Sequence, residues 1–280
     1  MRIETLDRWS EAGRPHNEDA VGATTWAAWA IDGTKGPYDR QLTPGPTDAT
    51  WHARALNCAL ATRYAELPPD PVAALAQVAE QLSRAYLADA AEAPAHEQPS
   101  ACLALAACDA AGVLHLFNIG DCRILIERAG AVRPFGSSGI EPLEAAAIAE
   151  LDRLRQVMGE DGARAQLRKL FRHNFKTAIN RAGGYWVVHP SLPWLHSVQH
   201  MRLSAGEAGH LLLATDGFYR LVNLFRAYDD PALVAAALDG GLQALGIELR
   251  RREAEDPSCR DYPRLKPMDD ATAILIALRA

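Results

Sequence analysis

The sequence of 280 residues lacks the features that mark several large classes of protein. Its first residues lack the apolar core of a signal peptide, and it has no apolar run long enough to cross a bilayer. Positive charge is not in excess, because 29 Lys and Arg residues against 35 Asp and Glu residues give a net charge of −6. We therefore expect a cytoplasmic monomer that binds neither membranes nor nucleic acid.

Cysteine and histidine are present, but their spacing is not that of metal ligands. The five cysteines are scattered, odd in number and free of any CxxC pair, which argues against a zinc site and a disulfide framework. The histidines show no metal-ligand spacing either. We expect small buried thiols in a reducing compartment, and ordinary surface or core histidines.

Apolar periodicity predicts a domain that mixes strands and helices. Strands are expected at residues 2–9, 20–25, 26–31, 101–108, 113–119, 122–128, 132–135, 209–215 and 271–278. Helices are expected after residue 50, at 72–91, 142–158 and 162–180, after residue 217, and at 231–245. The four strands within residues 100–135 are joined by short turns and are expected to form an antiparallel meander. No boundary divides the chain, so we predict one α+β domain spanning residues 1–280.

Acidic residues stand where the most apolar strands meet loops. Asp32 follows the run WAAWAI, Asp216 follows LLLAT, and Asp269 precedes ATAILIAL, while Asp121 lies at a turn between strands. Neighbouring antiparallel strands bring such ends to one rim, where unpaired carboxylates repel and raise one another's pKa. A divalent cation relieves that repulsion, and ligands that are all oxygen suit Mg²⁺ or Mn²⁺. Two such ions can activate a water molecule near neutral pH.

Five short blocks carry a resemblance to a known family. In chain order they are GRPHNEDA, AIDGTKG, NIGDCRI, LLLATDGFY and DDATAILIAL. Together, over residues 14–278, they resemble the bacterial type of the metal-dependent, type 2C serine/threonine protein phosphatases. The resemblance implies a four-layer α-β-β-α sandwich, two antiparallel sheets flanked by helices. It also implies hydrolysis of phosphoserine and phosphothreonine in proteins, with two Mn²⁺ or Mg²⁺ ions and a third, weaker ion.

The resemblance also assigns metal ligands by position. Asp32 would bridge the two metals, and the backbone carbonyl of Gly33 would complete one of them. Asp216 and Asp269 would bind the other metal. Asp19 would belong to the same metal site. These assignments agree with the oxygen-only ligands expected above.

Further roles follow from the resemblance for residues around the metals. Glu18, like Asp19, would hold metal-bound water, and Asp121 would help to bind the third ion. Arg14 would grip the substrate phosphate with its forked donors while the activated water attacks phosphorus in line. The substrate would be a phosphorylated protein, such as the product of a serine/threonine kinase.

Two of the departures of the chain from the family pattern concern catalysis and substrate choice. Thr34 stands where many relatives have histidine, a candidate general acid. The usual loop after the meander is replaced by an insertion at about residues 136–203, helical around 140–182, which is expected to influence substrate choice. Its second helix is strongly basic (Arg164, Arg168, Lys169, Arg172, Lys176, Arg181). Such a helix is either a solvated face or a patch for an acidic or phosphorylated partner.

Two other interpretations compete with this one. The segment AIDGT is similar to the D-x-D-G-T motif of haloacid dehalogenase-like phosphatases, but Ala30 occupies the position of their nucleophilic aspartate. That family also requires parallel strands alternating with helices. The second alternative is a weak or inactive phosphatase-like scaffold or phospho-sensing regulator. Retention of Asp32, Asp216 and Asp269 argues against a scaffold, which has no need for three mutually repelling carboxylates.

Overall fold

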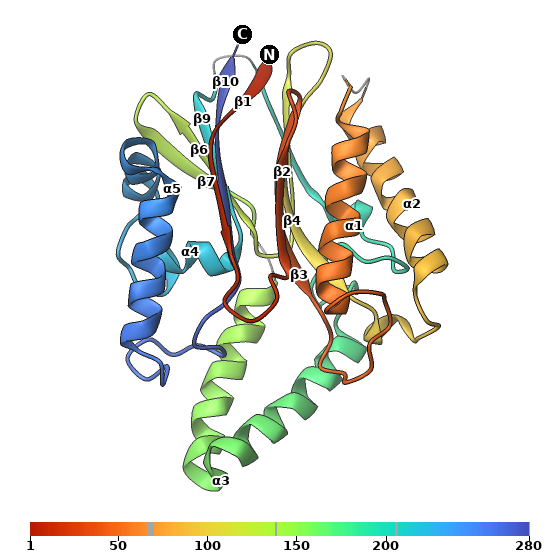
Figure 1. Ribbon diagram of the computed structural model, residues 1–280, viewed down its shortest axis with the longest axis vertical. Coiled ribbons are helices and arrows are strands. Elements are labelled where there is room, and N and C mark those ends of the chain that lie inside the picture. Colours follow the sequence, from red (N-terminus) through yellow and green to blue (C-terminus); the bar gives the residue numbers. More distant parts are fainter. Residues whose placement is uncertain (67–69, 138, 205–206, 280) are drawn as a thin grey trace.

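Two antiparallel five-stranded sheets packed face to face form the centre of the computed structural model, which describes residues 1–66, 70–137, 139–204 and 207–279 (Figure 1). Sheet A has the strand order β1 (Arg2–Glu11), β10 (Ala271–Arg279), β9 (His210–Ala214), β6 (Arg123–Arg128) and β7 (Ala131–Phe135). Sheet B has the order β2 (Asp19–Ala23), β3 (Ala27–Thr34), β4 (Ser100–Cys108), β5 (Leu114–Ile119) and β8 (Gln199–Leu203). Every strand pair is antiparallel, which excludes the haloacid dehalogenase-like alternative.

Strands β3 and β4 lie at the centre of sheet B because both of their faces are apolar. Ala28 and Ala30 pack in the core between the sheets, while Trp29 and Ile31 point to the opposite face and pack under helices. This alternation is the period of two expected of an extended strand. All nine residues of β4 are buried, as expected for a strand covered on both sides.

Helices cover the outer face of each sheet. Helices α1 (Asp48–Arg63) and α2 (Pro71–Asp89) lie on sheet B, and α4 (Asp216–Asn223) and α5 (Asp230–Glu255) lie on sheet A (Figure 1). The predicted α+β, four-layer α-β-β-α sandwich is therefore confirmed. Among the described helices, α5 has the length and apolar composition of a membrane span. However, Gly241 (φ 78°) interrupts it, and its apolar residues pack on sheet A.

Helix α3 (Ile140–Thr177) projects from the end of the sandwich opposite the two termini (Figure 1). Gly159 (φ 73°, ψ 177°) breaks it into two arms, which correspond to the two helices predicted from the sequence. A small apolar core joins the arms, formed by Ala147, Leu151, Leu154, Ala163 and Leu167. The second arm is fixed to the loop after β3, because the Arg172 Nε donates to the Pro37 carbonyl at 2.9 Å and Tyr38 Oη donates to the Arg172 carbonyl at 3.3 Å.

The predicted meander is wrong at one turn. Strand β5 pairs with β4 and β8, whereas β6 pairs with β7 and β9, so the chain crosses from sheet B to sheet A between them. Gly120 makes this crossing possible: its φ is +82°, and a Cβ there would lie 2.2 Å from the Cys102 Sγ. Apolar alternation identified the strands correctly but carries no information about which strands pair. The thiol prediction is also wrong at Cys58, which is exposed on α1, whereas the other four free cysteines are buried.

Short 3₁₀ helices complete the described elements. They are η1 (Ala95–Glu97), before β4, and η2 (Leu195–Ser197), before β8. Neither has a side-chain cap. Each lies in a connection that leads the chain back to a strand of sheet B.

Candidate active site

Strand pairing brings the predicted carboxylates to one end of the sandwich. Asp32 lies within β3, not after it as the sequence suggested, and pairs across the strands with Asp19 on β2. Asp216 opens α4 one residue after β9, and Asp269 lies two residues before the start of β10, the neighbour of β9 in sheet A. Gly217 allows these two segments to touch, because a Cβ at this position would lie 2.0 Å from the Asp270 carbonyl oxygen. The contact therefore requires glycine.

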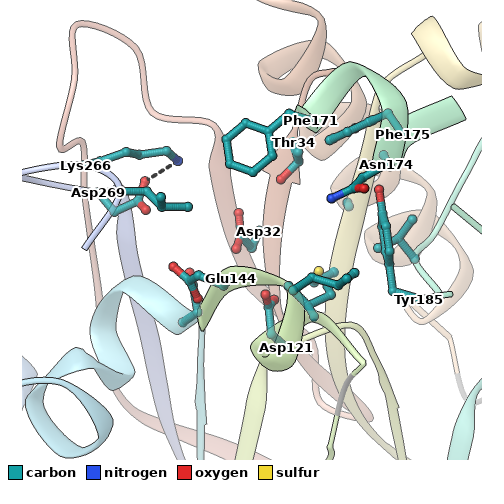
Figure 2. A pocket seen from close by; sticks show the side chains of 18 of the residues that line it. Asp32, Thr34, Asp121, Glu144, Phe171, Asn174, Phe175, Tyr185, Lys266 and Asp269 are labelled. Atoms are coloured by element: carbon teal, nitrogen blue, oxygen red, sulfur yellow. Dashed lines mark hydrogen bonds and ion pairs between the residues drawn. The ribbon is translucent and has the colours of Figure 1, made fainter. Parts of the chain in front are cut away.

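These carboxylates open onto a cavity of about 220 Å³ between the sheets and α3. Its acidic lining consists of Asp32, Asp121, Glu144, Asp216 and Asp269, all but Asp216 labelled in Figure 2. Asp121 comes from the crossing between the sheets, and Glu144 comes from the first arm of α3. Residues far apart in the sequence thus supply one acidic chamber. Glu144 was not predicted, because the sequence of an acidic helix does not show that the helix folds over the site.

Burial and mutual repulsion disturb the ionisation of this cluster. Burial raises the pKa of Asp32 well above its usual range, and the charges of Asp216, Asp19 and Asp121 raise it further. Burial, followed by the charge of Asp216, raises the pKa of Asp121 to about 7. The pKa of Glu144 is also raised by burial and by Asp216. The cluster is therefore electrostatically unfavourable without a compensating positive charge.

The chemistry of the lining fits hard divalent cations. Asp121 Oδ1 is buried and has no hydrogen-bond partner within the described part of the chain. Burial and the charges of Asp32 and Asp121 raise the pKa of the Cys102 and Cys122 thiols beside the cluster, which disfavours their thiolate forms. Carboxylate oxygens are the ligands that Mg²⁺ and Mn²⁺ prefer. Across the described residues, no three His, Cys, Asp or Glu side chains already stand at metal-ligand spacing.

Asp269 differs from its acidic neighbours because two cations of the same chain are paired with it. Its Oδ1 accepts from the Lys266 Nζ at 2.9 Å, and its Oδ2 accepts from the Arg220 Nη2 at 2.9 Å (Figure 2 shows the lysine). Burial would raise the pKa of Asp269, but the charges of Lys266 and Arg220 outweigh burial and lower it. Buried Arg220 also donates to Glu253 at 2.8 Å. Neither cation was predicted from the sequence to lie beside Asp269.

The predicted water-holding residues are also hydrogen-bonded within the protein. Buried Glu18 accepts from the Arg14 Nη2 at 2.6 Å, and Asp19 Oδ2 accepts from the Thr215 Oγ1 at 2.9 Å. Asp270 accepts from the backbone N–H groups of Gly13 and Glu18, each at 2.9 Å, and so ties the loop after β1 to β10. This loop places Arg14 outside the cavity lining.

Arg14, Gly33 and Thr34 occupy the rim and wall of the site. The Arg14 side chain is 41% exposed and lies near enough to Lys266 and Asp269 to act on their pKa values. Gly33 is buried, and its N–H donates to the Glu18 carbonyl at 3.0 Å. Thr34 lines the cavity beside Phe171 (Figure 2). The structure thus gathers the predicted residues at one end of the sandwich, and their individual roles remain predictions.

The basic second arm of α3 is partly neutralised by the chain itself. Arg164 pairs with Glu160 at 2.5 Å, and Arg168 and Arg172 approach Asp39 at 3.8 and 3.4 Å. These pairs are largely exposed and contribute little to stability. They favour the solvated-face interpretation over a patch for a phosphorylated partner.

Comparison with solved structures identifies the fold. The serine/threonine phosphatase PstP/Ppp of Mycobacterium tuberculosis matches over 100% of both chains, with a TM-score of 0.60 and 15% identity. The catalytic domain of PstP in complex with two manganese ions matches over 99% of this chain and 98% of its own, with a TM-score of 0.58 and 18% identity. Stp1 of Staphylococcus aureus matches over 99% and 95%, with a TM-score of 0.56 and 14% identity.

These similarities establish a shared fold across the full chain. No protein-family model matches the sequence, and no curated protein does so either. The fold is that of the type 2C serine/threonine phosphatases, as the five sequence blocks indicated.

Proposed function

We propose that this chain, which has the type 2C phosphatase fold, is a metal-dependent phosphatase that hydrolyses phosphoserine and phosphothreonine in proteins. One observation carries the proposal: Asp32, Asp121 and Asp216 come from separate segments and converge in one cavity. Their repulsion favours a divalent cation. We further propose a cytoplasmic monomer whose substrate is a phosphoprotein, such as the product of a serine/threonine kinase, and which binds neither nucleic acid nor membranes.

Separate residues of the chain would bind the metal ions, orient the water and bind the phosphate. Asp32, Asp216, Asp269 and the Gly33 carbonyl would hold two Mn²⁺ or Mg²⁺ ions, and Asp121 would help to hold a third. When bound, the ions would supply an activated water and neutralise the phosphoryl oxygens. Asp19 would orient water through its carboxylate, which Thr215 holds in place. α3 covers one side of the cavity and so limits access of bulk solvent.

Phosphate release from phosphoserine and phosphothreonine peptides tests this proposal. The purified protein, supplied with Mn²⁺, is expected to release inorganic phosphate with multiple turnovers. A scaffold or phospho-sensing regulator would bind the peptides and release no phosphate at any Mn²⁺ concentration.

Arg14→Ala is expected to raise KM for phosphopeptides about 10-fold or more, because a charged hydrogen bond to the phosphate is lost. The value of kcat is expected to change less, since Arg14 lies outside the cavity lining. Steady-state kinetics measure both constants, and Arg14→Lys is expected to give an intermediate KM. An unchanged KM in Arg14→Ala would remove the phosphate-binding role.

One observation favours the alternative of a weakly active regulator. Lys266 and Arg220 are bonded to both oxygens of Asp269, a carboxylate that the resemblance assigns to a metal. These internal cations compete with a metal ion for the same oxygens. The activity of the protein would then depend on the concentration of free metal, whereas a constitutive phosphatase would keep its metal bound.

Lys266→Met is expected to tighten Mn²⁺ binding roughly 3- to 5-fold, the scale of one partly exposed ion pair. Isothermal titration calorimetry measures the affinity without reference to activity. Lys169→Met, an exposed lysine on α3, is the matched control and is expected to leave the affinity unchanged. Equal or weaker Mn²⁺ binding by Lys266→Met would show that the lysine does not compete with the metal.

A further inference from the structure

Apart from the carboxylates, the cavity lining is largely apolar, although Thr34 and Asn174 are part of it, and α3 supplies much of it (Figure 2). Its large apolar side chains include Leu143, Phe171, Phe175, Tyr185 and Leu265, of which Figure 2 labels Phe171, Phe175 and Tyr185. We call these five residues the apolar wall. The acidic cluster and the apolar wall share one continuous cavity. A phosphate group bound at the acidic end would therefore place the rest of its substrate against the wall.

The apolar wall comes from both arms of α3, from the segment that follows α3 and from the loop before β10. Leu143 lies on the first arm, and Phe171 and Phe175 lie one helical turn apart on the second arm. All three side chains are only partly buried, although they are large and apolar. Phe175 packs edge-on against Tyr185, with ring centroids 6.4 Å apart. The helix thus presents an apolar face to the cavity without filling it.

Contacts at both ends of α3 hold this face in place. Near its start, Arg123 pairs with Glu141 and donates to the Gly136 carbonyl at 2.7 Å. Near its end, Arg172 exchanges hydrogen bonds with Pro37 and Tyr38. A preformed wall needs little ordering when a ligand binds, which favours recognition.

The size and charge of the cavity limit what the wall can receive. The cavity, of about 220 Å³, is smaller than the ~300–1,000 Å³ of typical small-molecule pockets. It can take a phosphorylated side chain and one neighbouring side chain, but not a folded segment. Lys266 and Arg220, which line the cavity, are both bonded to Asp269. An acidic neighbour would therefore meet repelling carboxylates and apolar carbon.

We infer that the apolar wall is a specificity subsite for a bulky apolar or aromatic residue directly flanking the phosphorylated serine or threonine. This inference rests on the proposed phosphatase function and names its substrate class. The flanking side chain packs between Leu143 and Phe171 while the phosphate lies at the carboxylates. Phosphopeptides with alanine or glutamate in the flanking position lose this contact, and glutamate is also repelled.

Matched phosphothreonine peptides that differ only in the flanking residue test the inference. With Mn²⁺ present, the wild-type protein is expected to prefer phenylalanine over alanine about 10-fold in kcat/KM, the discrimination typical of an apolar pocket. Phe171→Ala is expected to reduce that ratio to below about 3-fold. Leu170→Ala removes the neighbouring exposed leucine of the same helix and is the matched control, with the ratio unchanged.

Two further variants keep the test decisive. Leu143→Ala, from the other arm, replaces Phe171→Ala if that variant does not fold, and it is expected to reduce the same ratio. Phe171→Lys is expected to shift the preference toward a glutamate-flanked peptide. Equal kcat/KM for all flanking residues in the wild type, or an unchanged ratio in both wall variants, would overturn the inference.

A binding measurement separates this inference from the proposed function. Fluorescence anisotropy of the same labelled peptides reports the flanking preference without hydrolysis. If no peptide is hydrolysed but the phenylalanine peptide still binds more tightly, the phosphatase proposal fails and the subsite stands. If peptides are hydrolysed but bind and react without preference, the subsite fails and the phosphatase proposal stands.

Discussion

Replacing Asp32 with asparagine is expected to reduce phosphate-ester hydrolysis at least about 100-fold, since loss of even an outer contact at a metal site typically costs 10- to 100-fold. Asp32 is the proposed ligand shared by two ions, so its loss affects both. The amide has nearly the same shape as the carboxylate, and β3 is buried and paired on both sides. The fold is therefore expected to survive.

The same substitution is expected to stabilise the metal-free protein. Burial and the charges of Asp216, Asp19 and Asp121 raise the pKa of Asp32, which means that its ionised form is unfavourable in the folded state. Asparagine carries no charge and removes this repulsion, so the Tm of the chelated variant is expected to rise by roughly 2–4 °C.

Asp239→Asn is the matched control for Asp32→Asn. Asp239 is exposed on α5, outside the cavity lining, and its substitution is expected to change neither turnover nor Tm. Kinetics with p-nitrophenyl phosphate and thermal melting in chelator provide the two readouts. Near-normal turnover in Asp32→Asn would refute the assignment of this carboxylate.

Removal of divalent metal is expected to abolish hydrolysis and to lower the Tm. The carboxylates would lose the cations that offset their repulsion, and no side chain of the proposed mechanism replaces the activated water. Dialysis against EDTA followed by titration with Mn²⁺ or Mg²⁺ measures both effects, and full recovery is expected on metal addition. Stabilisation by the metal follows from binding to the folded state alone.

The control for metal removal is the Asp32→Asn protein, whose Tm is expected to respond far less to Mn²⁺. Phosphatase activity that persists in EDTA would contradict a metal-dependent mechanism. A Tm rise of equal size in the wild type and the variant would place the bound Mn²⁺ at other residues.

The fold was predictable because its strongest signals are local. Apolar runs around Trp29, Leu105 and Leu212 marked strands that are buried on both faces, and the position of each carboxylate beside such a run indicated a common rim. The break of α3 lies at Gly159, between the two helices expected from the apolar pattern. Partner choice was not predictable, because the crossing at Gly120 depends on its contact with Cys102, a residue distant in sequence.

Among the carboxylates of the cavity, those beside an apolar run or a turn between strands were predictable from the residues alone. Asp32 and Asp216 follow apolar runs, so their positions followed from sheet geometry. Glu144 and Lys266 lie in a helix and a loop whose packing over the cavity depends on tertiary contacts. The pairing of Asp269 with two cations has the same origin, because Lys266 and Arg220 meet it only in the folded chain.

Anomalous diffraction from crystals soaked in Mn²⁺ tests the central claim most directly. If the two-metal site is correct, we expect two strong anomalous peaks within coordination distance of the Asp32 carboxylate, one of them also in contact with Asp216. A map without a peak between Asp32 and Asp216, from crystals that hold Mn²⁺ elsewhere, would contradict it.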